Sequence, residues 1–583
     1  MTKSSDPSRL ETTKVTENTW WRLDAHGRAL AILVLVALAL RMYGIWNADH
    51  SDEYNEVFEA LRVCSGHLNL ERWAKRFYLY VLSVEYGIYY AAGRLLGVFA
   101  SPFDFAARVV RDLSPLLILG RATSAVLGSA SVYLTYRIGT LLFSRSAGLL
   151  GALFFSLNVV HTEISHHARV DATLCFMMLL AFSFIARIQV QKPNSHVRSY
   201  LLTGLFTGIA FQTKAPAIVL VVPFFFAHFF GNGVANPLCV LADRRILFYA
   251  LFLCLGLVIG NPAVLVAPER FVMHLIGLGS VYSTPINETM SEHIGLIAYM
   301  YSLYHELGIP LSALALYALI RGILSKRRMD LLLLSFIIPF YLVIGISRYL
   351  VGPHYLLPMM PILYLLCAAK METLLSRIPL SPRLKPALCS LVWVVLLLHP
   401  AKHLYRLELS LSGKNTRVIA KEWIEANIPP GSRILMDSGK SINSFAPTIA
   451  ENRASIERTL DEKRKALADG TLDDPTLIVD NTALLYYELL LQSVPEKSYD
   501  ITSTKFGLEL RPIDEYVREG YRYFVISQNM KTSRTTEFFA ARHPEASAFY
   551  RSLDHDRRLR LIWVIGPTPR NQGDAYLIYK VSG

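Results

Sequence analysis

Ionisable residues stand beside long apolar runs at four separate places in the chain. The stretch "HHARVDATLCF" (166–176) puts two histidines, an arginine and an aspartate against the start of one run, and "NADHSDEY" follows another. Lys214 interrupts "FQTKAPAIVLVVP", and Arg348 and His354 precede "YLLPMMPIL". Basic side chains of this kind hold phosphate groups, and a carboxylate can take a proton. The pattern predicts a polar site that binds an anionic group.

Membrane-spanning helices must position these residues. Of the 583 residues, 52% are hydrophobic and only 18% are charged, and such a composition allows apolar runs long enough to cross a bilayer. We predict a polytopic α-helical membrane protein with a C-terminal soluble α/β domain. The eleven expected spans lie near 29–46, 116–143, 147–164, 171–190, 199–213, 215–230, 246–262, 295–320, 331–347, 355–371 and 387–400.

The distribution of basic residues sets the predicted orientation. The net charge of +13 comes largely from short loops between spans, where the positive-inside rule accounts for it, so nucleic acid is not an expected partner. Counting 77–100 as a further crossing would move most of the basic loops to the outer side, against the positive-inside rule. We therefore expect an interfacial helix there. An integral plasma (inner) membrane protein follows, with residues 1–27 as a cytoplasmic tail and 28–401 as the transmembrane domain.

Two parts of the chain are expected on the outer side. Residues 47–115 form a large first external loop. From 402 to 583 the composition changes to mixed charged and apolar segments. Among them "NTRVIAKEWIEANIPPGSRILMDSG" indicates a helix, a turn and a strand. "TLIVD", "YRYFVIS", "LRLIWVIG" and "AYLIYKV" indicate short strands. An odd number of spans places this α/β domain on the external, periplasmic side.

Each candidate residue also has a purely structural interpretation. Asp52 can cap a helix whose first turn holds Glu53. Arg169 and Asp171 can be an anchor and a cap at the edge of a span, and Lys214 can extend toward the interface. These interpretations weaken in combination, because all of the residues fall at outer ends of predicted spans. Costly ionisable side chains at that depth usually face one another or a cavity.

Six stretches carry a resemblance to a known family. The first span followed by "DE", the arginine-led "LGRATSAVLGSASVYLTYRIGT" and the span start "ARVD" resemble the integral-membrane glycosyltransferases of the GT-C fold. The likeness is to their protein O-mannosyltransferase and lipid A aminoarabinose transferase group in particular. "GLFTGIAFQTKAPAIVLVVP", "RYLVGPHYLLPMMPIL" and "TRVIAKEWIEANIPPGSRIL" are similar to that group's glycine-rich span, RY/LP-P span start and opening of the exported domain. The resemblance covers about residues 28–440.

The resemblance implies an inverting transfer of a sugar from a polyprenyl-phosphate donor to a lipid, glycan or protein hydroxyl on the outer face of the membrane. It implies that Asp52 is the general base or orients the acceptor, with Glu53 beside it and Asp171 ordering the site. The side chains that it assigns to the lipid phosphate or the sugar are Arg121, Arg169, Lys214, Arg348, His354 and Tyr355. Cationic groups can stabilise a phosphate leaving group without a soluble cofactor.

Two features depart from the group. The proline-rich "KPP" or "HPP" element of the first external loop is absent, and the stretch there reads "ERWAKRFYLYVLSVEYGIYY". The arginine-aspartate element is preceded by "HTEISHH", in which Glu163 and His167 are four residues apart and share a helix face. A divalent metal held by Glu163, His166 and His167 is therefore a hypothesis, with satisfied interfacial histidines as its alternative.

The alternative function is a transporter or flippase of lipid-linked precursors with an accessory external domain. Such a protein also needs many spans and a polar cavity, but it normally shows paired halves with matching broken helices. The sequence has no such internal repeat, and its polar residues gather at one membrane boundary. The sequence therefore favours a glycosyltransferase of the cell envelope.

Overall fold

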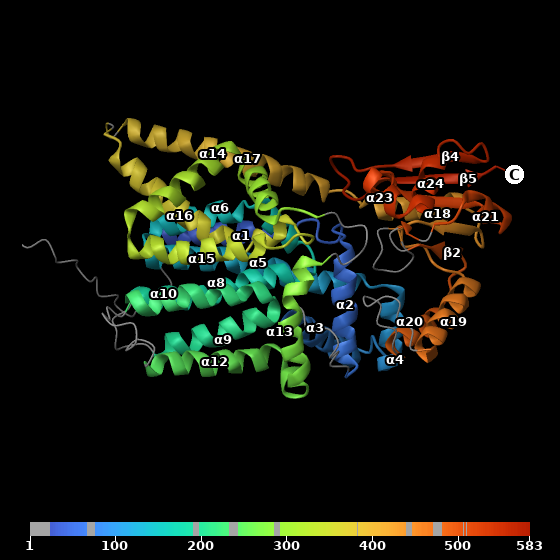
Figure 1. The fold of residues 1–583 in the computed structure, drawn as a ribbon, viewed down its shortest axis with the longest axis horizontal. Coiled ribbons are helices and arrows are strands. Elements are labelled where there is room, and N and C mark those ends of the chain that lie inside the picture. The colour runs from blue at the N-terminus through green and yellow to red at the C-terminus, as the bar shows by residue number, and fades with distance from the viewer. Residues whose placement is uncertain are drawn as a thin grey trace, which may run out of the picture.

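A long helical bundle and a smaller α/β unit lie end to end in the computed structural model (Figure 1). The described residues are 24–66, 76–190, 197–231, 243–284, 292–379, 381, 383–438, 446–469, 481–504, 507–508 and 510–582. Apolar helices fill the first part of the chain and a five-stranded sheet lies in the last part. This arrangement confirms the predicted fold class.

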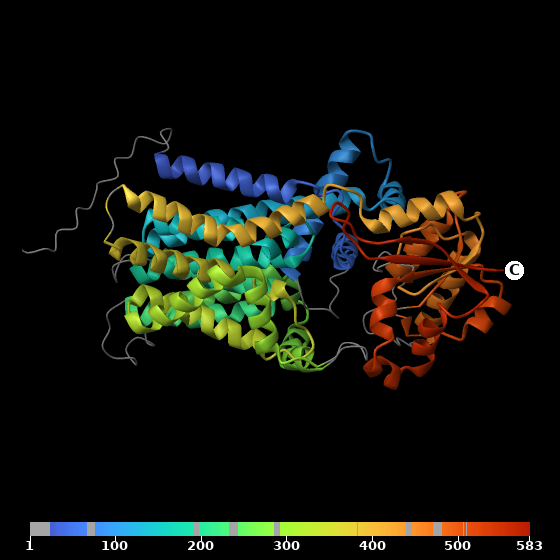
Figure 2. The ribbon, with the colours of Figure 1, turned by 90° about the horizontal axis from the view of Figure 1, so that it is seen from above.

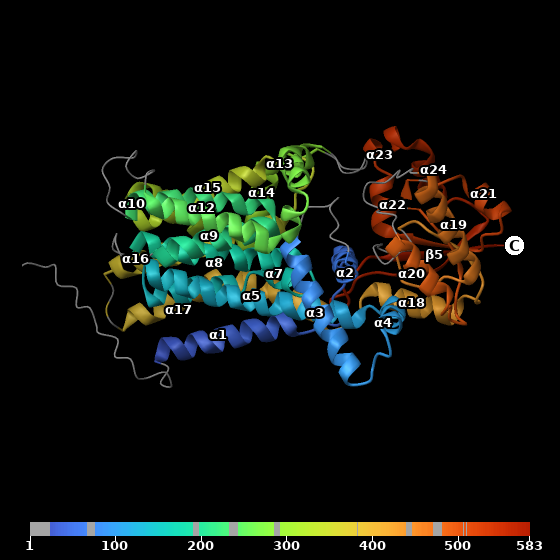
Figure 3. The same cartoon turned by 90° about the horizontal axis from the view of Figure 1, so that it is seen from below.

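The helices of the bundle run side by side along its long axis (Figures 1 and 3). They are α1 (Ala25–Met42), α5 (Ser114–Leu142), α6 (Arg145–Ser156), α7 (Val159–Ser165), α8 (Val170–Val190), α9 (Val197–Thr213), η1 (Ala215–Leu220), α10 (Val221–Gly231), α12 (Arg244–Gly260), α14 (Gly295–Ser325), α15 (Arg328–Gly345), α16 (Met360–Arg377) and α17 (Leu384–Ser410). Each predicted span falls on one or two of these helices.

Six of the described helices are long and apolar enough to cross a membrane, namely α1, α5, α8, α14, α15 and the 387–410 part of α17. A seventh crossing is possible if α6 and α7, which are bent by 64° at their junction, count as one broken span. The helices α9 and α12, of 17 residues each, also lie in the bundle. Eleven crossings remain a prediction.

Helices α9 and α12 pack with their backbones almost touching. A Cβ added to Gly256 would lie 2.1 Å from the carbonyl oxygen of Leu205, and one added to Gly208 would lie 2.3 Å from that of Leu253. Only glycine permits this approach. The tight pair fixes the end of α9, directly before Lys214, against the end of α12 at Asn261.

Further elements lie across the end of the bundle that faces the α/β unit (Figures 1 and 3). They are α2 (Ser51–Cys64), α3 (Arg76–Leu95), α4 (Pro102–Arg111), η2 (Pro262–Leu265), α13 (Pro268–Ser283) and η3 (Pro353–Leu356). Helix α3, which runs obliquely across the bundle end in Figure 3, covers most of the predicted interfacial segment at 77–100, and its place in the interface remains a prediction.

The C-terminal unit is built on a mixed sheet in the order β2-β1-β3-β5-β4. Strand β1 is parallel to β2 and β3, whereas β5 is antiparallel to β3 and β4. The strands are β1 (Arg433–Met436), β2 (Asp500–Ser503), β3 (Tyr523–Ser527), β4 (Leu559–Ile565) and β5 (Tyr576–Val581). The helices are α18 (Thr416–Asn427), α19 (Arg453–Asp469), α20 (Asn481–Leu491), α21 (Ile513–Arg518), α22 (Gln528–Arg534), α23 (Glu537–Arg542) and α24 (Pro544–Ser552).

The strands predicted from "SRILM", "YRYFVIS", "LRLIWVIG" and "AYLIYKV" are confirmed as β1, β3, β4 and β5. The predicted strand "TLIVD" lies outside the described residues. Strand β2 was not predicted, and the expected domain boundary between 401 and 402 falls inside α17.

Hydrogen bonds tie the α/β unit to the end of α1. The Asn47 side-chain amide donates to the Leu411 carbonyl at 2.8 Å, and the Gln572 amide donates to the Asn47 carbonyl at 3.2 Å. Gly44, with φ of +65°, lets the backbone turn here, and a Cβ on it would lie 2.7 Å from that of Leu411. The sheet domain is thus docked on the segment that follows α1 (Figure 2).

Candidate active site

Four charged side chains form an alternating row at the bundle end that faces the α/β unit. The Arg169 guanidinium lies 3.2 Å from the Asp52 carboxylate and 3.5 Å from that of Asp171. The Lys214 ammonium donates to Asp171 at 2.7 Å. We call Asp52, Arg169, Asp171 and Lys214 the charge network. It joins α2, α8 and the end of α9, so the structure brings together residues from three distant parts of the chain.

The members of the charge network differ in exposure. Side chains of Arg169, Asp171 and Lys214 are 10%, 2% and 15% exposed, whereas that of Asp52 is 42% exposed. Among the described residues Asp171 Oδ2 has no hydrogen-bond donor, although it lies within ion-pair distance of Arg169. Asp171 is therefore buried between the two cations and holds both in place, and Asp52 is the carboxylate that a molecule from solution can reach.

The start of α2 directs Asp52 toward Arg169. The N-cap is His50, whose Nδ1 accepts from the Asp52 backbone at 3.1 Å, while the Glu53 carboxylate accepts from the His50 backbone at 3.0 Å. This reciprocal arrangement is a capping box. The interpretation of Asp52 as the helix cap is thus wrong, because His50 fills that role.

Glu53 and Arg121, expected in catalysis and in substrate binding, pair with each other. Arg121 donates from Nε and Nη2 to the two Glu53 oxygens at 2.7 and 2.9 Å, and the Ala168 backbone donates to Glu53 at 2.7 Å. Arg121 Nη1 donates to the Ile45 carbonyl at 2.9 Å. Their side chains are 0% and 5% exposed, so neither faces a substrate. The pair instead locks α2 against α5 and the start of α8.

The neighbours of Glu53 favour the ionised form of its carboxyl group. Burial by itself raises the pKa of a carboxyl group, but Arg121 and His167 together hold the pKa of Glu53 well below its ordinary value. His167 lies 3.3 Å from Glu53. Glu53 is therefore held as an anion by its two partners.

His354 and Tyr355 border the charge network. The Lys214 ammonium lies 4.2 Å from the centre of the Tyr355 ring, and the His354 and Tyr355 rings are 4.3 Å apart. Burial, together with Lys214 and Arg169, lowers the pKa of His354 to about 4, although the nearby Asp171 carboxylate raises it. His354 is neutral at pH 7 and offers a hydrogen bond rather than a charge.

The expected phosphate ligand Arg348 does not join the charge network. Its guanidinium pairs with Glu292 at 3.0 Å, and its side chain is 64% exposed. An arginine before a span is equally suited to anchoring the interface, which explains why the sequence pattern suggested more than the structure supports.

The structure also corrects the hypothesis of a metal at Glu163, His166 and His167. His166 uses both ring nitrogens on the carbonyls of Thr162 and Tyr43, at 2.8 and 3.0 Å. His167 pairs with Glu53, and Glu163 is exposed. Within the described part of the chain, no three His, Cys, Asp or Glu side chains are grouped to hold a metal ion. The histidine alternative is the better account of "HTEISHH".

One contributor was missed in the sequence. His50 Nε2 lies 3.4 Å from the Arg169 guanidinium, and the His50 ring is tilted against that of His167 with ring centres 5.4 Å apart. Helix N-caps are usually Ser, Thr, Asp or Asn, so residue type did not mark His50 as the cap.

The arrangement fits one kind of chemistry well. Two buried cations held by a buried carboxylate can bind and stabilise a phosphate, and a half-exposed carboxylate beside them can accept a proton. A growing negative charge would be met by groups that are already oriented.

Comparison with known proteins gives one sequence match. Residues 118–264 match the family model of dolichyl-phosphate-mannose-protein mannosyltransferases. The matched segment spans about a quarter of the chain and contains Arg169, Asp171 and Lys214, whereas Asp52 lies outside it. It confirms the predicted resemblance over that segment. No curated protein matches the chain.

Several solved structures are similar in shape. ArnT from Cupriavidus metallidurans bound to undecaprenyl phosphate is 13% identical with a TM-score of 0.45, covering 95% of this chain and 98% of that one. The Archaeoglobus fulgidus oligosaccharyltransferase tethered with an acceptor peptide is 10% identical with a TM-score of 0.48, covering 94% and 74%. The S. cerevisiae Pmt1-Pmt2 complex bound to the sugar donor is 19% identical with a TM-score of 0.31, covering 45% and 35%. Likeness at this level does not identify the reaction.

Proposed function

We propose that the protein transfers a sugar from a polyprenyl-phosphate donor to a hydroxyl group of a lipid, glycan or protein acceptor. The observation that carries the proposal is the charge network, in which half-exposed Asp52 contacts a cation that is shared with buried Asp171. The match of residues 118–264 to a family of dolichyl-phosphate-mannose enzymes supports the donor class.

The proposed transfer assigns a role to each of these side chains. Arg169 and Lys214 bind the donor phosphate, and the Tyr355 ring bounds the position of Lys214. The acceptor hydroxyl approaches the anomeric carbon from the face opposite the phosphate, and Asp52 takes its proton as the new carbon–oxygen bond forms. The bond between the anomeric carbon and the phosphate oxygen breaks, and its electron pair leaves on the lipid phosphate. The two cations stabilise that charge, and the anomeric configuration inverts.

The location follows from the same proposal. The charge network and the α/β unit lie at one end of the bundle (Figure 1), and the positive-inside rule assigns that end to the external, periplasmic side of the plasma (inner) membrane. The transmembrane domain at 28–401, the external loop at 47–115 and the external domain at 402–583 then all contribute to one site. A lipid-linked donor reaches this site within the outer leaflet.

The test is donor turnover in a defined bilayer. The purified chain is reconstituted in lipid with a panel of polyprenyl-phosphate sugars, and release of the lipid phosphate is followed with and without cell-envelope glycolipids as acceptors. Consumption of one donor, with the sugar recovered on an acceptor, supports the transferase. Movement of an intact lipid-linked sugar across the bilayer without consumption would support the alternative, a transporter or flippase, and refute the proposal.

A further inference from the structure

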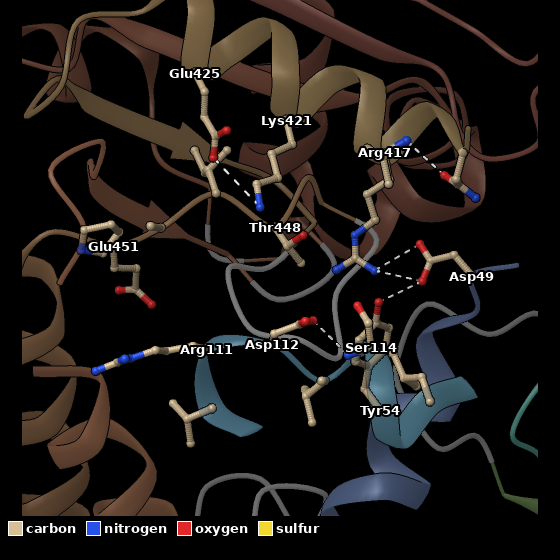
Figure 4. Close-up of a pocket in the computed structure, with 18 of the residues that line it drawn as sticks. Asp49, Tyr54, Arg111, Asp112, Ser114, Arg417, Lys421, Glu425, Thr448 and Glu451 are labelled. Atoms are coloured by element: carbon tan, nitrogen blue, oxygen red, sulfur yellow. Dashed lines mark hydrogen bonds and ion pairs between the residues drawn. The ribbon is translucent and has the colours of Figure 1, made fainter. Parts of the chain in front are cut away.

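Residues on both sides of Asp52 contact one arginine of the α/β unit (Figure 4). Asp49 precedes α2, and Tyr54 lies in the first turn of that helix. Arg417 Nη1 donates to the Asp49 carboxylate at 3.2 Å, and the Arg417 guanidinium lies 5.3 Å from the centre of the Tyr54 ring. The Tyr54 hydroxyl donates to Asp49 at 2.9 Å. We call Asp49, Tyr54 and Arg417 the docking triad.

Arg417 is itself held in place within the α/β unit. It lies at the start of α18, where the side chain of Asn415 caps the helix by accepting from the Arg417 backbone at 2.9 Å. Arg417 Nε donates to the Ala446 carbonyl at 2.5 Å. The side chains of Arg417 and Asp49 are 5% and 16% exposed, and separating such a buried pair is costly. The α/β unit therefore presents a fixed cation to the start of α2.

The same part of the α/β unit also binds the segment before Asp49. The Gln572 amide donates to the Asn47 carbonyl at 3.2 Å. The Gln572 carbonyl in turn accepts from the backbone of Thr416, the residue before Arg417, at 2.8 Å. Asn47 and Asp49 are thus held by two loops of the α/β unit that are hydrogen-bonded to each other.

The position of Asp52 depends on how the start of α2 is held. The Asp52 side chain is 42% exposed, so the packing of its neighbours does little to fix it. Glu53 holds one face of α2 to the helical bundle. Asp49 and Tyr54, three residues before Asp52 and two after it, hold the same turn to the α/β unit. A loss of either hold would move Asp52 relative to Arg169, and a displacement of about 1 Å can slow a reaction about a hundredfold.

We infer that Arg417 is a positioning residue of the active site. It acts through Asp49 and Tyr54 on the start of α2. By this route it keeps the Asp52 carboxylate within reach of Arg169. Its effect on turnover rests on the proposed transferase function, whereas its hold on α2 does not. Undocking of the α/β unit would then stop transfer without removing any group that touches the substrate.

The first experiment separates positioning from general stability by measuring kcat, KM and Tm of the reconstituted full-length chain. Arg417→Gln should lower kcat for the lipid-linked donor at least tenfold and change the donor KM less than twofold, because the cations that bind the phosphate stay in place. Arg417→Lys restores a cation opposite Asp49 and should recover part of the lost kcat. The matched control is Lys370→Met, which breaks the ion pair with Asp330 between α16 and α15, whose side chains are 9% and 1% exposed. Lys370→Met should lower Tm at least as much as Arg417→Gln and leave kcat unchanged.

Milder variants keep the test valid if Arg417→Gln does not fold. Asp49→Asn retains the size of the side chain but removes its charge, and Tyr54→Phe removes only the hydroxyl group. Each should lower kcat several-fold. In the double variant Asp49→Asn/Tyr54→Phe the loss should be smaller than the product of the two, because both changes act on one hydrogen bond. Wild-type kcat in all of the docking-triad variants that fold would overturn the inference.

Hydrogen exchange gives a readout that needs no donor. Amide exchange of residues 50–57, followed by mass spectrometry, reports opening of the first turns of α2, where the Asp52 backbone donates to His50. Arg417→Gln should speed exchange in this segment at least tenfold, and Lys370→Met should leave it at the wild-type rate. Unchanged exchange in Arg417→Gln, in a chain that consumes donor, would refute the positioning role alone. Faster exchange in Arg417→Gln, in a chain whose wild type consumes no donor, would refute the transferase alone and leave the hold on α2 established.

Discussion

The Glu53–Arg121 pair provides a direct test of how α2 is held against the helical bundle. Glu53→Gln keeps the size of the side chain and removes its charge. In the wild type both Glu53 oxygens accept hydrogen bonds from Arg121, and one also accepts from the Ala168 backbone. The NH2 group of the new glutamine amide cannot accept a hydrogen bond, so it would face a donor in place of an acceptor. Arg121 would remain as a buried guanidinium without its counter-charge.

The expected cost follows from burial. The side chains of Glu53 and Arg121 are 0% and 5% exposed, and removing one partner of such a buried pair costs about 3–5 kcal/mol. The ion pair of Asp104 with Arg108 on α4 is the matched control, since its side chains are 29% and 55% exposed. Exposed pairs of this kind contribute about 0–1 kcal/mol, and an Asn oxygen can still accept from the Ala100 backbone, so Asp104→Asn should cost little.

The assay is thermal unfolding of the purified full-length chain, followed by intrinsic fluorescence. Glu53→Gln and Arg121→Met should each lower Tm much more than Asp104→Asn. The double variant should lower it by less than the sum of the two, because it leaves no unpaired buried charge. The turnover rate should fall in the same order as Tm, because α2 carries Asp52 and a loosened α2 would misplace it.

The pH dependence gives an independent check. The pKa of Glu53 is lowered in the folded chain, so its ion pair stabilises the protein above the ordinary value of 4.5 and the benefit is lost as pH falls below it. The difference in Tm between wild type and Glu53→Gln should be constant from pH 8 to pH 5 and shrink at lower pH. A Tm for Glu53→Gln equal to that of Asp104→Asn would refute the account.

Three further predictions concern single sites. Lys214→Met should reduce kcat/KM for the lipid-linked donor at least tenfold in a radiolabelled-donor assay, because it leaves the buried Asp171 carboxylate without its 2.7 Å partner, and unchanged kinetics would remove Lys214 from the site. Burial raises the pKa of Asp437 to about 7, so the folded state resists ionisation and loses stability as pH rises from 3.8 through about 7. Asp437→Asn should therefore raise Tm at pH 8 but not at pH 4, whereas an equal shift at both would contradict this. Gly256→Val should prevent the close packing of α9 and α12 and lower Tm by several degrees, while Gly87→Ala, where a Cβ meets nothing within 4 Å, should not, and equal Tm values would refute the packing argument.

The sequence predicts the helices well because membrane helices are marked by long apolar runs. Predicted spans at 116–143 and 171–190 differ from α5 and α8 by no more than two residues at either end. The meeting of Asp52, Arg169 and Lys214 is predictable for the same reason, since helix ends on one side of a membrane share one plane. Strand β2, of only four residues, carries too short a pattern to be seen.

Pairings across long sequence distances could not be predicted. Glu53 and Arg121 are 68 residues apart, and nothing in either segment shows that they meet rather than face a substrate. Arg417 stands in an amphipathic helix among exposed charges, yet docking of the α/β unit buries it against Asp49. In both cases the tertiary contact decides the role, and residue type and spacing carry no information about it.

The half-exposed carboxylate of Asp52 is the group on which the proposed chemistry depends. Asp52→Asn removes the base and leaves the helix cap on His50 intact, because the backbone donates that hydrogen bond. Asp104→Asn, in the first turn of α4, is the matched control. Donor consumption with acceptor present should fall by at least a hundredfold in Asp52→Asn, with Tm and donor binding retained, and stay at the wild-type rate in Asp104→Asn. Equal turnover by wild type and Asp52→Asn would contradict the assignment of Asp52 as the base and with it the proposed active site.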